Sequence, residues 1–182
     1  EHIKKILGKG SHPLHEPLFI GNEIKYLKKT IKSSYVSSIG KYISVFEEKI
    51  KKITGAKYAI ATVNGTEALH ISLKGVGVKK NDEVLVPALT FIGTVNAITY
   101  CGAEPHFIDS EICSLGVDSK KLEEYLKKIV IFVNGKTINR YTRRTISAVM
   151  PVHVFGHPCK IEEIVKISKK YNLAVVEDAA EA

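Results

Sequence analysis

The spacing of apolar residues along the chain changes near Tyr58. Before that point, apolar residues recur three or four positions apart, a spacing that predicts two helices. Their apolar faces carry Ile24, Leu27 and Ile31 in the first helix and Phe46, Ile50 and Ile53 in the second. Asn22 is of a type that caps helix starts, and Gly55 of a type that ends helices. The pattern therefore predicts an amino-terminal helical segment over residues 1–57, with an irregular start.

From Tyr58 onward, short apolar runs alternate with amphipathic stretches. The apolar runs predict strands at residues 58–62, 82–87, 106–109, 148–154 and 173–178. The amphipathic stretches predict helices at residues 66–74, 90–100, 119–128 and 161–171. Strands that are apolar throughout are buried on both faces, and crossover helices supply the cover. Residues 58–182 are therefore predicted to form an α/β fold with a mostly parallel sheet sandwiched by helices.

A polar stretch, residues 134–145, interrupts this alternation. It begins with Asn134 and Gly135, a pair typical of two-residue hairpin turns. We expect an excursion at the surface there.

Length and composition narrow the class of protein. The chain has 182 residues, 45% of them hydrophobic, which is enough for a sizeable core. It has no run of 18 apolar residues and no signal-peptide pattern, so we expect a soluble cytoplasmic protein with no membrane partner. Cys101, Cys113 and Cys159 are odd in number and far apart, which fits neither a disulfide framework nor a metal site. No bound metal is expected.

The net charge of +8 raises the question of a nucleic-acid partner. Most lysines, however, come in scattered pairs that fall on polar helix faces or in turns. We therefore expect solvated surfaces and no nucleic acid. One patch of basic residues is dense, and it consists of Arg140, Arg143 and Arg144. Whether this patch binds an anionic partner is left open by the sequence.

Polar residues follow several of the predicted strands, at the edge where ligands bind in such sheets. In VNGTEALHISL, Asn64, Gly65 and Thr66 open a helix directly after a strand. The exposed N–H groups and positive dipole end of such a helix form a phosphate cradle, although the same residue types also cap helices that bind nothing. Neither Gly-x-x-x-x-Gly-Lys-Ser/Thr nor Gly-x-Gly-x-x-Gly is present, which disfavours P-loop and dinucleotide sites.

Further candidates lie at the same edge. LAVVED ends in Glu177 and Asp178, which point to opposite faces. A carboxylate at the mouth of a buried strand can bind a metal, act as a base, pair with a cation or cap the next turn. Phe91 is either a core residue or a platform for a flat ligand. His153 and His157 have either a ligand contact or a structural hydrogen bond. A phosphate cradle, a flat apolar face and a carboxylate together suit pyridoxal phosphate, with its phosphate, flat ring and cationic nitrogen.

Three stretches resemble the DegT/DnrJ/EryC1/StrS family of nucleotide-sugar aminotransferases. They are NGTEALHISL, VPALTFIGTVNAITYCGAEPHFID and VMPVHVFGHPCKIEEIVKISKKYNLAVVEDAAEA. The resemblance runs from about Pro13 to Ala182. It implies fold type I, dependence on pyridoxal phosphate, and that residues 58–182 are the amino-terminal part of the cofactor-binding large domain. Residues 16–50 look most similar to the branch that aminates UDP-linked 4-keto-6-deoxy sugars for legionaminic-type sialic acids.

The resemblance implies specific roles. Gly65 and Thr66 would hold the cofactor phosphate through backbone N–H and hydroxyl groups, and Phe91 would stack on the pyridine ring. Asp178 would be the catalytic residue, because an anion beside the pyridinium nitrogen favours the protonated ring on which amino transfer depends. Two other cofactor-binding positions depart from the family pattern. Asn64 stands where many members have Ser.

Glu181 stands where many members have Gln or His, and an ionised Glu cannot donate to the cofactor's phenolate oxygen. The family's Schiff-base lysine lies in a Ser-x-x-Lys motif downstream of Glu-Asp-Ala-Ala, whereas this sequence ends at Ala182. We therefore expect an amino-terminal fragment that lacks this lysine and is inactive alone.

The resemblance also implies partners. The parent enzyme would transfer an amino group, with glutamate as donor, to a nucleotide-linked 4-keto-6-deoxy sugar in bacterial surface-sugar biosynthesis. It would be a homodimer. Two alternatives stay open: a sugar dehydratase on the same fold, in which His replaces the lysine, and a truncated chain without activity.

Overall fold

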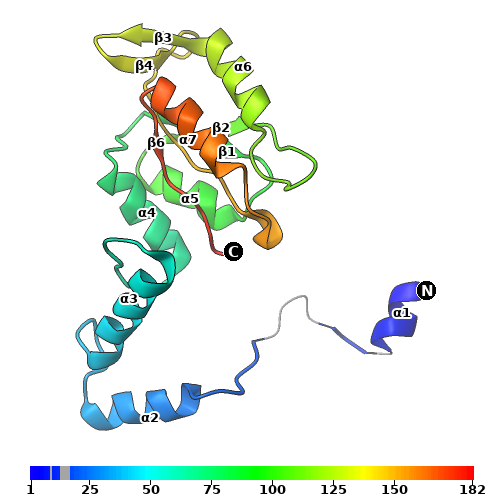
Figure 1. The fold of residues 1–182 in the computed structure, drawn as a ribbon, viewed down its shortest axis with the longest axis vertical. Coiled ribbons are helices and arrows are strands. Elements are labelled where there is room, and N and C mark those ends of the chain that lie inside the picture. The colour runs from blue at the N-terminus through cyan, green and yellow to red at the C-terminus, as the bar shows by residue number, and fades with distance from the viewer. Residues whose placement is uncertain (9, 13–16) are drawn as a thin grey trace. The chain divides into compact units, whose positions relative to one another are not determined.

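The structure is a computed structural model that describes residues 1–8, 10–12 and 17–182 (Figure 1). Pro13, where the family resemblance begins, lies outside the described residues. The chain divides into two compact units, Glu1–Ala61 and Thr62–Ala182. A domain boundary after residue 57 stays a prediction. Within the described ranges, no helix combines the length and the apolar character that crossing a bilayer requires.

The described residues of the first unit form three helices, α1 (His2–Leu7), α2 (Glu23–Ser33) and α3 (Lys41–Thr54). The last two confirm the predicted pair, and α3 ends at Gly55, whose φ of 72° is left-handed. The expected irregular start is wrong for α1, because the apolar residues of HIKKIL fall three and four positions apart before Gly8 ends the turn. Neither α2 nor α3 contains a buried residue.

The second unit is built on a parallel sheet, whose described strands follow the order β2-β1-β5-β6. These strands are β1 (Glu83–Pro87), β2 (Glu104–Ile108), β5 (Ile146–Val149) and β6 (Ala174–Val175). Each overlaps a predicted strand, although β5 shares only residues 148–149 with the predicted range 148–154 and β6 is much shorter than predicted. Every residue of β1 is buried, as expected of a strand covered on both faces.

Helices cover both faces of this sheet and confirm the predicted α/β fold (Figure 1). They are α4 (Gly65–Gly75) and α5 (Ile92–Tyr100) on one face, and α6 (Ser119–Ile129) and α7 (Ile161–Lys170) on the other. Successive residues of β1 point into two separate cores: Val84 and Val86 pack with α4 and α5, and Leu85 packs with α6 and α7. Burying Leu85 completely contributes about 2 kcal/mol.

The strand β5 contains one residue more than its neighbour β1. Glu83 pairs with Ile146 but Val84 pairs with Ala148, so Ser147 is the extra residue of a bulge. Residues two apart in a regular strand share a face. Because of the bulge, Ile146 and Ala148 instead point into different cores.

The polar excursion contains the predicted hairpin. β3 (Val130–Val133) and β4 (Lys136–Asn139) pair antiparallel, and the two residues between them are Asn134 and Gly135. Their φ angles of 50° and 75° are both left-handed, as a tight turn of this kind requires.

Residues 58–62 do not form the predicted buried strand. Tyr58 and Ile60 are 74% and 78% exposed. A strand needs a neighbour for its backbone hydrogen bonds, and none of the described residues pairs with this segment. Apolar composition alone therefore did not determine pairing here.

The amino end of β1 carries a buried carboxylate, Glu83, which is only 3% exposed. It accepts hydrogen bonds from Thr142 Oγ1 at 2.5 Å and Asn139 Nδ2 at 2.8 Å, and His106 Nδ1 lies 2.9 Å away. Burial raises the pKa of Glu83, but these hydrogen bonds outweigh burial and hold the pKa below its ordinary value of 4.5. The carboxylate thus ties β1 to β2 and to the excursion after β3.

We expect Glu83→Ala to destabilise the protein by about 3 kcal/mol, because the buried Asn139 amide and the less buried Thr142 and His106 side chains lose their common acceptor. The folded-state pKa is lowered, so the carboxylate's contribution is complete above the ordinary pKa and disappears as pH falls through the folded-state value. Urea unfolding of wild type and variant should therefore show a larger difference at neutral pH than in acid. Glu83→Gln, which keeps an acceptor, should fall between them. Equal stabilities at neutral pH would contradict this role.

Candidate functional site

Asp178 lies just beyond β6, at the carboxyl edge of the sheet. Its backbone N–H donates to the carbonyl of Pro151 at 2.9 Å, and its carbonyl accepts from the N–H of His153 at 3.1 Å. The segment after β6 therefore continues parallel to the segment after β5. Asp178 is only 6% exposed, whereas the side chain of Glu177 is half-exposed. The two carboxylates point to opposite sides, as the sequence predicts.

The carboxylate of Asp178 is held by two donors. Thr94 Oγ1 donates to Oδ2 at 2.5 Å, and the N–H of Ala180 donates to Oδ1 at 3.2 Å. Thr94 lies in the first turn of α5 and is 1% exposed. Burying a carboxylate is costly unless donors replace water. Each oxygen accepts one hydrogen bond and keeps further capacity, so the group can also accept from a cation.

The start of α4 has the geometry expected of an anion cradle. Asn64 is its N-cap, and its Oδ1 accepts from the N–H of Glu67 at 2.8 Å. The N–H groups of Gly65 and Thr66 come before the first intrahelical bond, and no acceptor for them lies among the described residues. Asn64 therefore has the structural capping role, while two N–H groups at the positive helix end stay available.

The starts of α4 and α5 lie against each other. A Cβ atom placed on Gly93 would lie 2.6 Å from Thr66 Oγ1 and 3.1 Å from Phe91 Cδ1, so glycine is needed for this approach. The next residue, Thr94, donates to Asp178. Along this path Thr66 Oγ1 and the Asp178 carboxylate are at most roughly 13 Å apart, given the fixed spacing of Cα atoms. One small cofactor can bridge such a span.

Phe91 and Glu181 occupy different positions in this arrangement. Phe91 immediately precedes α5 and is 73% exposed, so its ring is not a core residue. Glu181 Oε2 accepts from the N–H of Phe155, in the short helical turn η1 (Val154–Gly156), at 2.5 Å. The structure thus gives Glu181 a role as acceptor for that turn, and its contact with a cofactor stays a prediction.

The two histidines predicted at the carboxyl edge of the sheet have different environments. His153 is 7% exposed, accepts from the N–H of Cys159 through Nδ1 at 3.1 Å, and places Nε2 3.0 Å from Glu177. Both ring nitrogens are thus engaged, which favours the structural role. His157 is exposed.

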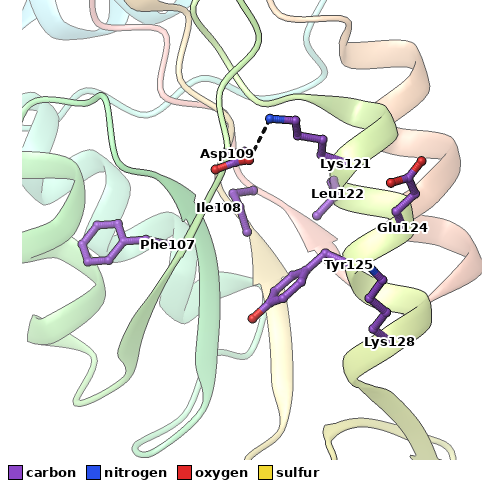
Figure 2. Close-up of a pocket in the computed structure, with 8 residues that line it drawn as sticks. All are labelled: Phe107, Ile108, Asp109, Lys121, Leu122, Glu124, Tyr125 and Lys128. Atoms are coloured by element: carbon purple, nitrogen blue, oxygen red, sulfur yellow. Dashed lines mark hydrogen bonds and ion pairs between the residues drawn. The ribbon is translucent and has the colours of Figure 1, made fainter.

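A groove of about 480 Å³ lies elsewhere, between the edge strand β2 and α6 (Figure 2). Lys121 Nζ pairs with Asp109 Oδ2 across its rim at 2.9 Å, so these two charges compensate each other. None of the predicted site residues lines it. Within the part of the chain that the structure describes, no group of three or more His, Cys, Asp or Glu residues is arranged to hold a metal ion.

Sequence analysis did not single out Thr94, and it assigned no role to the side chain of Thr90. Thr90 Oγ1 lies 2.7 Å from Thr94 Oγ1, so the two hydroxyls form a chain that ends on Asp178. The two residues are four apart, but Thr90 lies before α5 begins, so no helical spacing predicts that their hydroxyls meet. Nothing in that spacing points to Asp178, which is 84 residues from Thr94.

The parallel sheet between helices, with a helix start and a buried carboxylate at its carboxyl edge, defines the class: an α/β domain with the fold of pyridoxal phosphate-dependent transferases. The profile of the DegT/DnrJ/EryC1/StrS aminotransferase family matches residues 19–182. The chain belongs to this family.

Individual relatives agree with this assignment. The chain is 39% identical to GDP-perosamine synthase of Caulobacter vibrioides over 91% of its own length and 40% of that protein. It is 36% identical to the dTDP-3-amino-3,6-dideoxy-alpha-D-galactopyranose transaminase of Aneurinibacillus thermoaerophilus, over 79% of its length and 35% of that protein. The crystal structure of NtdA from Bacillus subtilis with bound PMP matches with a TM-score of 0.70 and 27% identity, covering 88% of this chain and 34% of that one. The chain thus spans well under half the length of these proteins.

The contact between the starts of α4 and α5 can be measured by a double-mutant cycle. We expect Gly93→Ala to destabilise the protein by about 1 kcal/mol, because its Cβ would strike Thr66 Oγ1. In a Thr66→Ala background the same change should be neutral or stabilising, since Ala favours helix over Gly. Thermal unfolding of the four proteins gives the coupling.

Gly75→Ala is the matched control, because a Cβ at Gly75 in α4 meets no atom within 4 Å. It should show no coupling to Thr66→Ala. Strictly additive effects of Gly93→Ala and Thr66→Ala would mean that the two helix starts are not in contact.

Proposed function

We propose that this protein is a pyridoxal phosphate-dependent aminotransferase that transfers an amino group, with glutamate as donor, to a nucleotide-linked 4-keto-6-deoxy sugar. The observation that carries the proposal is the buried Asp178 carboxylate, linked through the start of α5 to the open helix start at Gly65 and Thr66. Membership in an aminotransferase family supports the reaction type. The names of two relatives, a GDP-perosamine synthase and a dTDP-aminosugar transaminase, support the substrate class.

The residues of this chain fit the cofactor. The N–H groups of Gly65 and Thr66 would bind its phosphate, and the Thr66 hydroxyl would add a further donor. Phe91, exposed at the start of α5, would cover one face of the ring. Asp178 would accept a hydrogen bond from the ring nitrogen and hold the proton at that atom. When bound, the cofactor supplies the electron sink for amino transfer.

Asn64 and Glu181 already make hydrogen bonds within the protein, so we propose indirect roles for them in the cofactor site. Asn64 already caps α4 and would contribute by holding the cradle open rather than by a direct hydrogen bond. Glu181 accepts a hydrogen bond from the N–H of Phe155 and would position the η1 turn beside the cofactor. Both residues keep their place in the proposed site.

The remaining parts of the proposal concern the whole enzyme. They comprise a cytoplasmic homodimer, a lysine downstream of Ala182, residues 58–182 as the start of the large domain, and a role in bacterial surface-sugar biosynthesis. We also propose the legionaminic-type branch and its UDP-linked substrate. The relatives carry names with GDP and dTDP, so the nucleotide is the element of the proposal that most needs an experiment.

Asp178→Asn in the full-length protein should lower kcat for amino transfer by roughly a thousandfold, the effect of losing an ion pair of about 4 kcal/mol. The reason is that the neutral amide no longer favours a protonated ring nitrogen. The measurement is amine formation from a nucleotide-linked keto-sugar with glutamate present.

The control is Glu177→Gln, the same change of charge one residue away, on the half-exposed side chain that faces His153. It should keep activity within about threefold, as expected of a surface substitution. Similar activity losses in the two variants would argue against Asp178 as the partner of the ring nitrogen.

Substrate class and reaction type can be separated in one assay. UDP-, GDP- and dTDP-linked 4-keto-6-deoxy sugars are offered in turn with glutamate, and products are identified by mass spectrometry. We expect an amino sugar and 2-oxoglutarate, with the UDP-linked substrate preferred. A deoxygenated sugar without net amine transfer would instead support the dehydratase alternative, and preference for the GDP-linked substrate would overturn the branch assignment.

A further inference from the structure

We propose that Thr94 is a positioning residue for the cofactor site: its hydroxyl, itself oriented by Thr90, fixes the direction in which Asp178 presents its carboxylate. The inference rests on the proposed function, because it assigns a task to a residue that would touch Asp178 but not the cofactor. Its basis is a chain of two short hydrogen bonds, 2.7 Å from Thr90 to Thr94 and 2.5 Å from Thr94 to Asp178.

The Asp178 carboxylate determines the donor and acceptor in each of these two hydrogen bonds. An ionised carboxylate has no proton to give, so Thr94 must donate to Asp178 Oδ2. A hydroxyl has one proton, so Thr94 can meet Thr90 only as an acceptor, and Thr90 must donate to it. The Thr94 hydroxyl is therefore held with its proton directed at Asp178. Thr90 has a second, longer contact with the carbonyl of Phe91 at 3.4 Å, and its 2.7 Å contact with Thr94 is the closer one.

Burial gives this hydrogen bond its importance. Thr94 is 1% exposed and Asp178 6%, so bulk water does not compete for either group. The backbone of Asp178 is fixed by bonds to Pro151 and His153, and Oδ1 by the N–H of Ala180. The remaining freedom is the orientation of the carboxylate plane, and Thr94 is the donor that determines it through Oδ2. Catalytic groups need their orientation fixed in this way by neighbours that do not react.

The same hydrogen bond also has a purely structural interpretation, in which it attaches α5 to the segment after β6. That attachment has other support, because Ala97 and Ile98 of α5 are completely buried in the core shared with Val176. Loss of the hydroxyl should therefore disturb the carboxylate more than the helix. The two interpretations differ in what a variant changes, which is cofactor binding in one case and unfolding temperature in the other.

The experiment uses the full-length protein with pyridoxal phosphate as the probe. Thr94→Val keeps the shape and removes the donor, whereas Thr94→Ser keeps the donor. Three quantities are measured for each variant. They are the Kd for pyridoxal phosphate, the pH midpoint of the absorption change that reports protonation of the bound cofactor's ring nitrogen, and Tm. A less well oriented carboxylate pairs less favourably with a protonated ring, so the midpoint should move to lower pH.

For Thr94→Val we expect a Kd raised about tenfold, the scale of one hydrogen bond to a charged group, and a midpoint lowered by roughly one pH unit. Thr94→Ser should stay within about twofold of wild type, because the hydroxyl is retained. Thr90→Val should show a smaller effect of the same sign, about threefold in Kd, since it removes only the orientation of the Thr94 hydroxyl.

Each outcome decides between the claims. If wild type binds the cofactor and Thr94→Val changes only Tm, the role is structural and the inference is wrong. An equal loss in Thr94→Ser and Thr94→Val would also overturn it, because the hydroxyl would not be the cause. If wild type does not bind pyridoxal phosphate at all, the proposed function fails, and the role of Thr94 fails with it. Should Thr94→Val not fold, Thr94→Ser and Thr90→Val still give the comparison.

Discussion

The parallel pairing of β1, β5 and β6 is the constraint on which the rest of the structure depends. Parallel strands direct all their carboxyl ends to one edge, so residues far apart in sequence meet there without any local signal. This is how a threonine that follows β1 comes to lie within hydrogen-bond distance of an aspartate that follows β6. The helices contribute by covering both faces, which keeps water from the central strands β1 and β5.

The secondary structure could largely be predicted because its signals are local. α4 has an Asn N-cap whose side chain makes the expected capping bond, and the Asn134-Gly135 turn has the two left-handed φ angles that its residue types favour. β1 is apolar after Glu83, and all of its residues are buried. In each case the physical cause lies within a few residues, so one sequence is sufficient to find it.

Properties that depend on distant partners could not be predicted in the same way. Residues 58–62 have the composition of a strand, but pairing decides whether a strand forms, and no described residue supplies it. Asp178 was identified from its place after an apolar run, whereas its donor Thr94 was not, since the link between them exists only in the folded sheet. Glu181 was assigned by resemblance, and the structure adds its bond to the N–H of Phe155, which no pattern indicated.

The bulge at Ser147 has a consequence for how this fold can change over time. The extra residue determines which of the two cores each later residue of β5 enters. Deleting Ser147 would leave Ile146 opposite Glu83 and Ala148 opposite Val84 in a regular pair of strands, with each side chain still in its present core. Deleting a residue from the regular part of β5 would instead shift its neighbours by one position and exchange their cores. The bulge is therefore the position within β5 at which the fold best tolerates the loss of one residue.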